Sequence, residues 1–396
     1  MVNAGRSAIS ADPALDSVPG RLAARPGGGL LARHWHHLAL AVWAAICALL
    51  FVSGHGQSWH FFATGAHSLL CTSGTPPSAC GIHLYAAHPE LQIGPVSFLV
   101  AAAAAWWPGD DGVAVAAAAM MLAGLLALGI VEYNAYRSSP VSARPRLQAR
   151  VFLAGVVFMP AWADLAVHFG HLDDVLALVF TALAVRCVDR RAPAQLGACL
   201  ALATLSKPWA VAFLPLVFAI PHGRLRAVLW ATVPVALIGA VFVIGDPATL
   251  HAAGFGIPNA PSSPLRILGI ADPTTPSWDR PAQFTLGIVL GLVAVRRGRW
   301  PAVVMVAAAA RIALDPGVYS YYTAAILLGA IVWDLHARRG RIFPAWSWLV
   351  FGALFACRYL PLTPTTLGSL RLAVCVVVTV CALSLNRPLG QLARRD

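Results

Sequence analysis

The sequence predicts an all-α polytopic membrane protein. Of its 396 residues, 59% are hydrophobic and 11% are charged, and the mean hydropathy is +0.72. This composition is typical of a chain that places many helices in lipid. The arginines gather in short segments between apolar runs, as the positive-inside rule expects of cytoplasmic loops. We therefore assign the net charge of +12 to membrane topology and expect no nucleic-acid partner.

The apolar runs give the order of the expected helices. They cover residues 38–53, 93–107, 113–135, 151–167, 175–188, 194–206, 208–221, 227–245, 284–295, 301–314, 319–335, 345–360 and 369–385. Basic segments interrupt them at 1–33, 137–150, 186–191, 222–226, 296–299, 336–341 and 387–395. With every basic segment in the cytoplasm, the chain is expected to be a multi-pass plasma-membrane protein with both termini inside.

Two regions depart from simple crossings. Residues 194–221 lie between two inner basic segments, and two helices of about 13 residues are each too short for a ~30 Å hydrocarbon core. They predict a short hairpin with Lys207 and Pro208 near its tip. The run 93–107 predicts a juxtamembrane or re-entrant outer helix, because the next run, 113–135, has to lead inward.

These rules predict about ten spanning helices, one short hairpin and one outer juxtamembrane helix. We expect a single integral membrane domain at 34–385, between a disordered cytoplasmic tail at 1–33 and a cytoplasmic tail at 386–396. The domain is expected to contain the first outer loop with its helix, the hairpin and a further outer loop, at 54–112, 194–221 and 246–283.

Among the 28 basic residues only Lys207 is a lysine. It lies in the apolar stretch 198–220, where a cation is costly unless it is paired or faces water. A lysine is also a compact point charge suited to holding a phosphate. We predict a functional role for Lys207; the alternative is a lysine beside the helix break at Pro208 that extends to the interface.

The first outer loop is rich in histidine and holds one carboxylate, Glu90. Its histidines are His55, His60, His67, His83 and His88. Their spacing matches no zinc pattern, so we predict neither a metal site nor a cofactor. Glu90 is either a general base or a carboxylate favoured by the N-terminus of the helix at 93–107.

The cysteines divide into two groups. Cys71 and Cys80 share the first outer loop, where a disulfide is plausible if the loop is extracytoplasmic. The other six fall in apolar runs and are expected to be small core residues.

The second outer turn, His168 to Asp174, opens a helix. One of its aspartates could cap that helix, since Asp is a good N-cap and negative charge suits that end. Two adjacent aspartates, Asp173 and Asp174, with His168 and His171 exceed what capping needs. We therefore predict that this turn belongs to a site.

The loop 246–283 is long and proline-rich, and loops of that kind are often functional. Its Arg266 and Arg280 are expected to face outward in a chain that otherwise keeps arginine inside. Each is a candidate anion ligand or a headgroup contact.

A fourth polar patch begins at Arg311. Arg311 lies four residues before Asp315, a spacing that predicts an ion pair on one helix face. Tyr319 and the tyrosines that follow it fit either a substrate contact or an interfacial aromatic belt.

Three stretches resemble the GT-C superfamily of membrane glycosyltransferases, and most closely its polyprenyl-phosphate-mannose-dependent branch, glycosyltransferase family 87 and its actinobacterial relatives. They are YAAHPELQIGP (85–95), FGHLDDVLALVFTALAVR (169–186) and GACLALATLSKPWAVAFLPLVFAI (197–220). The resemblance covers roughly the N-terminal 230 residues. The arrangement of helices carries it more than any invariant string.

The resemblance implies an inverting transfer of a sugar, expected to be mannose, from a polyprenyl-phosphate donor to a lipid or cell-envelope glycan on the outer face. Such transfer needs a base near the acceptor hydroxyl and fixed positive charge at the leaving phosphate. The implied bases are Glu90, Asp173, Asp174 and His60. The implied phosphate ligands are Lys207, Arg266 and Arg280. Substrate contacts are expected from His168, His171, Tyr85, Gln92, Arg311, Asp315 and Tyr319.

The chain departs from the family at one place. Family members usually carry an aspartate just after the first helix, where this sequence reads HGQSWH (55–60). Either Glu90 is then the base, or Asp173 or Asp174 is, or His60 replaces the aspartate, or the protein is inactive. A neutral histidine can serve as a base near pH 7.

Two other functions compete with sugar transfer. A transporter or flippase of lipid-linked sugars predicts paired discontinuous helices in two matching halves, and the sequence has one short hairpin without a counterpart. A catalytically silent GT-C-like subunit is compatible with the missing aspartate. The place of Glu90 relative to Asp173, Asp174 and Lys207 separates an active enzyme from a silent one.

Overall fold

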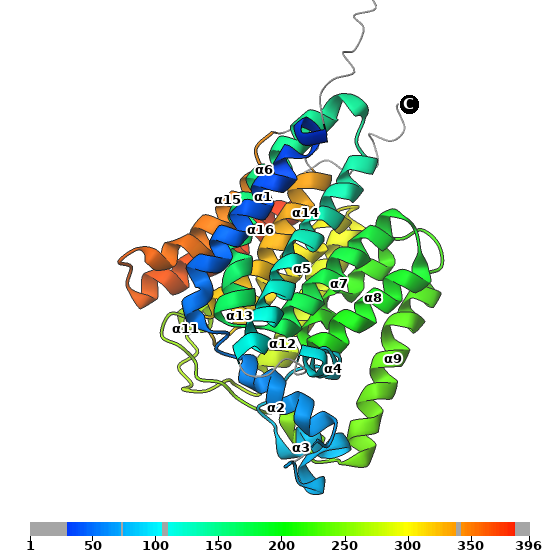
Figure 1. Cartoon of the computed structure of the whole chain (residues 1–396), viewed down its shortest axis with the longest axis vertical. Coiled ribbons are helices and arrows are strands. Elements are labelled where there is room, and N and C mark those ends of the chain that lie inside the picture. The colour runs from blue at the N-terminus through cyan, green and yellow to red at the C-terminus, as the bar shows by residue number, and fades with distance from the viewer. Residues whose placement is uncertain (1–29, 73, 105–109, 338–341, 385–396) are drawn as a thin grey trace, which may run out of the picture. The chain divides into compact units, whose positions relative to one another are not determined.

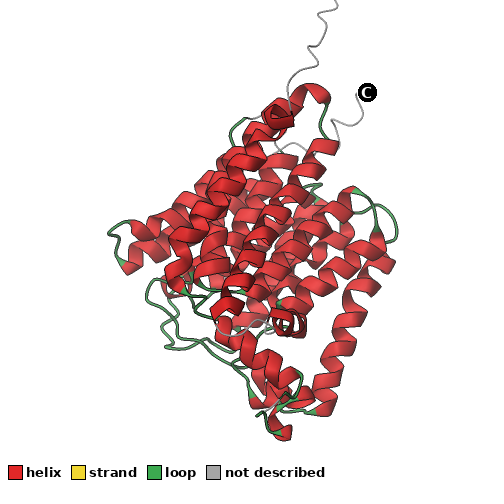
Figure 2. Ribbon diagram, in the orientation of Figure 1, coloured by secondary structure: helices red, strands yellow, loops and turns green. Residues whose placement is uncertain are grey.

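The computed structural model describes residues 30–72, 74–104, 110–337 and 342–384. Helices, turns and loops make up these residues (Figure 1), and the described part of the chain contains no strand, only a β-bridge between Pro258 and Thr274 (Figure 2). The predicted all-α class is confirmed. The chain divides into two units, Met1–Trp35 and a large unit, His36–Asp396, and the described residues belong to the large unit and to the helix that leads into it. The predicted tails lie almost wholly outside the described residues.

Five segments are long and apolar enough to cross a membrane: His34–Gly54, Gly112–Arg137, Val141–His168, Arg224–Gly245 and Pro364–Ser384. They correspond to α1 (Leu30–Phe51), α5 (Asp110–Arg137), α6 (Arg144–Ala163), α9 (Arg224–Gly245) and α16 (Pro364–Ser384). The protein is thus of the helical membrane type. The other described helices have 18 residues or fewer, so length and composition support five spans among the described residues and not the ten expected.

The longer of the remaining helices are α7 (Leu172–Asp189), α8 (Pro193–Ser206), α12 (Asp279–Arg296), α13 (Val303–Leu314) and α14 (Thr323–His336). The run 345–360 is irregular: α15 (Ala345–Val350) continues as the π-helix η9 (Phe351–Phe355) and the 3-10 helix η10 (Ala356–Tyr359). Single-turn elements are η1 (Val52–Gly54), η2 (Pro77–Ala79), η3 (Gly81–His83), η4 (Val141–Ala143), α10 (Thr249–Ala252), α11 (Pro264–Ile267), η7 (Trp300–Ala302) and η8 (Ser320–Tyr322).

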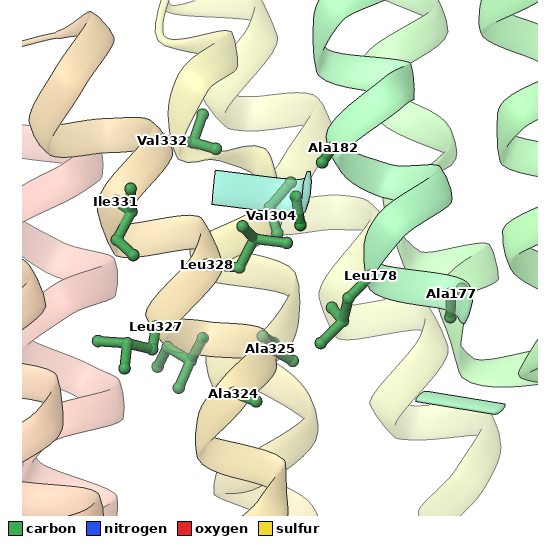
Figure 3. Packing of buried hydrophobic residues seen from close by; sticks show 14 of the residues in the cluster. Ala177, Leu178, Ala182, Val304, Ala324, Ala325, Leu327, Leu328, Ile331 and Val332 are labelled. Atoms are coloured by element: carbon green, nitrogen blue, oxygen red, sulfur yellow. The ribbon is translucent and has the colours of Figure 1, made fainter. Parts of the chain in front are cut away.

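Helices α7, α13 and α14 form the centre of the core. Leu178 of α7, Val304 of α13 and Leu328 of α14 point toward one another (Figure 3), and all three are buried. Every residue of α14 is buried, as expected of a helix that is apolar on all sides. Gly329 lets α14 approach α13 closely, because a Cβ there would lie 2.4 Å from the backbone nitrogen of Met305.

The predicted hairpin forms, with one correction. Lys207 separates α8 from η6 (Pro208–Phe218) and has the extended backbone that a residue before proline prefers. The second arm is a 3-10 helix and not the α-helix expected. It begins at Pro208 and contains Pro215, and neither proline can donate a backbone hydrogen bond.

The first outer loop folds into short helices. These are α2 (Trp59–Leu69), α3 (Leu84–Ala87) and α4 (Pro95–Ala104). With ten residues, α4 is only ~15 Å long and too short to span, as predicted. Cys71 and Cys80 form a disulfide in this loop. Helices α2 and α3 and the C-terminal end of α9 lie at the same end of the large unit, the lower end in Figure 1.

The close crossing of α13 and α14 gives a stability prediction. Gly329→Ala places a methyl group against the backbone of Met305 and is expected to cost about 1–3 kcal/mol. Gly239→Ala on α9 is the control, because nothing lies within 4 Å of its added Cβ. Thermal unfolding in detergent measures both. Equal unfolding temperatures for the two variants would contradict the close packing.

Candidate functional site

The turn between α6 and α7 positions the first part of the site. Helix α6 ends in the π-helix η5 (Asp164–His168), and α7 begins two residues after Gly170, whose φ is +67°. Glycine is needed there for that φ, and because an added Cβ would lie 3.1 Å from the Cα of Gly56. The backbone N–H groups of residues 56–58 donate to the carbonyls of residues 167–169. The segment that follows α1 is thereby bonded to the turn between α6 and α7.

Three segments bring five charged residues together, and we call these residues the charge cluster. They are Asp173 and Asp174 at the start of α7, Lys207 at the hairpin break, and Arg311 and Asp315 at the end of α13. The Lys207 ammonium bonds the Asp173 carboxylate and lies 3.4 Å from Asp174 Oδ2. Arg311 lies 3.6 Å from Asp174 and 3.7 Å from Asp315, so the predicted pair four residues apart forms.

Aromatic side chains complete the surroundings of the charge cluster. Trp209 Nε1 donates to Asp174 Oδ1 at 2.9 Å. The Arg311 guanidinium lies 4.4 Å from the Trp209 ring and 4.1 Å from the Tyr322 ring, both within cation–π range. The three carboxylates of the cluster are at most 5% exposed. The charges are therefore held by one another and by these rings rather than by water.

A histidine joins the charge cluster to the first outer loop. His171 Nδ1 lies 3.3 Å from Asp173 Oδ1, and its Nε2 lies 3.1 Å from the Ser58 hydroxyl. Its ring stacks on Tyr321 at 3.9 Å. We call Ser58, His171 and Asp173 the relay. A carboxylate on one imidazole nitrogen and a hydroxyl on the other is the arrangement that lets histidine take a proton from that hydroxyl.

The prediction that an aspartate is the N-cap is wrong, although both aspartates lie in the first turn of α7, where negative charge is favoured. The N-cap of α7 is His171, and Asp173 and Asp174 lie inside its first turn. Asp173 Oδ1 accepts the backbone N–H of Asp174 at 2.8 Å while it also faces His171. Their acidic side chains thus serve the charge cluster.

Of the residues predicted from sequence, His171, Asp173, Asp174, Lys207, Arg311 and Asp315 come together. Arg280 also interacts electrostatically with Asp315, while its guanidinium donates to the Phe255 carbonyl at 3.1 Å. The sequence missed Ser58 and Trp209, and it left the tyrosines after Tyr319 open between a substrate contact and an aromatic belt. The fold places Tyr321 on the His171 ring and Tyr322 beside the Arg311 guanidinium.

Several predicted residues have other contacts. Exposed Glu90 bonds His88, so no contact among the described residues brings it into the charge cluster. His60 bonds the carbonyl of Gln57. The Tyr85 hydroxyl donates to the Ile93 carbonyl.

Two further predicted residues brace the outer loop. Gln92 donates to the carbonyls of Ala252 and Phe255. Arg266 donates to the carbonyl of Ala271.

His168 and Tyr319 lie beside the site through ring contacts. The His168 ring meets the rings of Phe51 and Phe169 edge-on. Tyr319 stacks on Tyr321 and lines a cavity of about 20 Å³, which also borders Arg371. A cavity of that size holds about one water molecule.

The site residues also bear on metal binding. Ligand atoms of His171, Asp173 and Asp174 lie within 4.8 Å of one another. The ammonium of Lys207, however, contacts both carboxylates at the same place. A metal ion there would meet a fixed positive charge, so this set suits a cationic network better than a metal.

A second ion pair supports the turn from the other side, and the sequence interpretation did not include it. Buried Asp164 accepts bonds from both terminal nitrogens of Arg358, each at 3.1 Å, and from Ser320 at 2.5 Å. Ser320 directly precedes Tyr321, which packs on His171. The pair therefore holds in place the segment that carries Tyr321. The sequence could have indicated this pair, because Asp164 and Arg358 are ionisable residues inside the apolar runs 151–167 and 345–360.

A hydrogen bond also fastens the first outer loop to the end of α9. His83 Nδ1 lies 2.8 Å from Asp246 Oδ2, and the backbone N–H of Ala248 donates to the same carboxylate. The bond with His83 first, and that backbone donor second, hold the pKa of Asp246 below its usual value of 3.8.

Comparison with known proteins adds no relative. No protein-family model matches the chain, and no curated protein or solved structure does either. Function must therefore be argued from the site.

The Lys207–Asp173 pair gives a double-mutant prediction. Lys207→Met or Asp173→Asn alone leaves a buried charge without its main partner and is expected to cost about 3–5 kcal/mol. The double variant is expected to cost about 0.5–3 kcal/mol less than the sum of the singles. Unfolding in detergent measures all three proteins. Strictly additive losses would contradict a direct pairing.

The lowered pKa of Asp246 gives a pH prediction. Its stabilising contribution is present above the usual carboxyl value of 3.8 and is lost as pH falls through the lowered folded value. The difference in thermal midpoint between the wild type and Asp246→Asn is expected to be present at about pH 5 and to shrink below about pH 4. Asp272→Asn, on the same outer loop, is the matched control. If the difference in midpoint between the wild type and Asp246→Asn grows as the pH falls, the folded protein does not lower the pKa of Asp246.

Proposed function

We propose that the protein is a membrane glycosyltransferase that moves a sugar, with mannose the first candidate, from a polyprenyl-phosphate donor to a lipid or cell-envelope glycan at the outer face of the plasma membrane. The observation that carries this proposal is the convergence of the relay and the charge cluster. One small region holds a hydroxyl-bonded histidine, an aspartate that orients it and two fixed cations. Acceptor deprotonation and phosphate departure need those groups.

His171 is the base in this proposal. The Ser58 hydroxyl on its Nε2 occupies the place that an acceptor hydroxyl takes when the acceptor displaces it. Asp173 on Nδ1 fixes the ring orientation and stabilises the imidazolium that forms. Glu90 contacts His88 and not the charge cluster, which is the arrangement that the sequence analysis associated with a silent subunit. In this proposal His171 instead supplies the function of the aspartate that the stretch 55–60 lacks, and Glu90 is not required.

Lys207 and Arg311 hold the donor phosphate as it leaves. An ammonium has three donors and a guanidinium has five, so each cation can keep its aspartate and still bind a phosphate oxygen. Ion pairs with Asp173 and Asp174 hold the Lys207 ammonium in place, and ion pairs with Asp174 and Asp315 hold the Arg311 guanidinium in place. Preoriented charge of this kind stabilises developing negative charge without reorganisation.

The arrangement of short helices supports the same proposal. Helix α4 is too short to span, and α8 and η6 form a broken hairpin with Lys207 at the break. Charge and length predicted both features, and they agree with the arrangement of helices in the GT-C superfamily. We propose a GT-C-like fold with about ten crossings, in which the shorter helices α7, α12, α13 and α14 and the irregular run 345–360 also cross.

The relay favours one other reaction class. A serine on the Nε2 of a histidine whose Nδ1 faces an aspartate is also the order of groups in serine acyl-transfer enzymes. Ser58 would then be a nucleophile that forms a covalent acyl-enzyme. The two proposed reactions differ in one requirement: acyl transfer needs Ser58 for turnover, and sugar transfer does not.

Transfer in membrane vesicles tests the proposal. Vesicles with wild type, His171→Ala, Lys207→Ala, Ser58→Ala or His251→Ala receive radiolabelled polyprenyl-phosphate-mannose and extracted envelope lipids. We expect kcat to fall by about 10²–10⁴ for His171→Ala, since a general base contributes that much. Lys207→Ala should also abolish most transfer, and Ser58→Ala should stay within a few-fold of wild type. Exposed His251 of α10 provides the control.

Other outcomes point elsewhere. Labelling by a serine-directed fluorophosphonate, lost in Ser58→Ala and His171→Ala, would favour the acyl-transfer reaction. No transfer by folded wild type with several polyprenyl-phosphate sugars would contradict the proposal and favour a silent subunit or a flippase.

A further inference from the structure

A second convergence of histidine and carboxylate lies far from the charge cluster, where side chains of α1 and α5 meet. His36 Nε2 lies 2.9 Å from one oxygen of Glu132, and His37 Nε2 lies 2.7 Å from the other. The two imidazole rings are 4.0 Å apart between centroids. Consecutive histidines on one helix thus face both oxygens of one carboxylate on another.

This group is separate from the relay and the charge cluster. Tyr133, the neighbour of Glu132, lies under the guanidinium of Arg186 at 5.1 Å. Arg186 is in the last turn of α7, whereas Asp174 is in its first turn. Twelve residues of helix separate them by ~18 Å. The positive-inside rule places this end of α5, which finishes at Arg137, on the cytoplasmic side.

The chemistry of the group matches a known ligand set. Two imidazole nitrogens and one carboxylate form a three-ligand zinc site that keeps a fourth position open for water. The ligand atoms of His36, His37 and Glu132 all lie within 4.8 Å of one another. In contrast to the His171 group, no lysine or arginine among the described residues pairs with Glu132. A divalent ion at this place would bind one carboxylate and two imidazole nitrogens.

The exposure of the three side chains is also compatible with a bound ion. The His37 side chain is 48% exposed, so protein does not enclose this side of the group. The side chains of His36 and Glu132 are 1% and 11% exposed, so the inner part of the group is shielded. A carboxylate inside an apolar run is costly unless a partner or an ion compensates it.

We propose that His36, His37 and Glu132 bind a divalent transition-metal cation, with Zn²⁺ as the probe ion. The ion replaces the hydrogen bonds between the two imidazoles and the carboxylate and ties α1 to α5. Only 22% of the α1 span is buried, so a tie at this end matters for how firmly α1 is held. Helix α1 leads into residues 56–58, which dock on the α6–α7 turn. This proposal does not depend on the proposed function.

Zinc binding to the full-length, tag-free protein in detergent tests the proposal. After chelator treatment and dialysis, titration calorimetry measures stoichiometry and affinity for the wild type, Glu132→Gln, His37→Ala and His83→Ala. We expect one Zn²⁺ per wild-type chain and at least about tenfold weaker binding in the first two variants, since even outer-shell changes cost 10–100-fold. His83→Ala is the matched control, because it removes a histidine that pairs with a single aspartate.

Folding is monitored separately. His37 is exposed, so the His37→Ala variant should fold even if the Glu132→Gln variant does not. Gel filtration and thermal unfolding in chelator show whether each variant is intact. Zn²⁺ should raise the unfolding midpoint of the wild type but not of His37→Ala. Binding well below one equivalent, or full-affinity binding that persists in His37→Ala and in folded Glu132→Gln, would overturn the proposal.

Discussion

The pairing of Asp173 and Asp174 with Lys207 and Arg311 is the interaction on which the rest of the site depends. Each of these charges would be costly in an apolar interior, and each is held by an opposite charge or an aromatic face. The pairing therefore requires that the start of α7, the hairpin break and the end of α13 meet. Such a network is weak evidence for stability but strong reason to look for function, because packed apolar residues would do the structural work at lower cost.

Interrupted helices make that meeting possible. Pro208 ends α8 so that Lys207 faces α7, and Gly170 turns the chain between η5 and α7. Backbone bonds from residues 56–58 then place Ser58 beside His171. Each interruption occurs where a proline, a positive φ or a π-turn breaks the regular hydrogen-bond pattern. The side chains of Ser58, His171 and Lys207 lie at these interruptions.

Sequence patterns predicted what is local. Composition and arginine placement gave the helical membrane class, Lys207-Pro208 gave the hairpin break, and the spacing of Arg311 and Asp315 gave their ion pair. Contacts between distant segments were not accessible: Ser58 and His171 are 113 residues apart, and no periodicity links them. Glu90 was one of four candidate bases because it is the one carboxylate of the first outer loop, but its contact is with His88. The second arm of the hairpin looked like an α-helix, because apolar periodicity does not distinguish a 3-10 helix that prolines impose.

The position of a bound donor phosphate tests the central claim most directly. A polyprenyl phosphate with a photoreactive group next to the phosphate can be crosslinked to the protein in vesicles and the adduct mapped by mass spectrometry. If the charge cluster holds the phosphate, adducts will lie on the start of α7, around Lys207 and Trp209, and near Arg311, and Lys207→Ala will reduce them. Adducts confined to the exposed faces of α9 or α16, unchanged in Lys207→Ala, would contradict the claim.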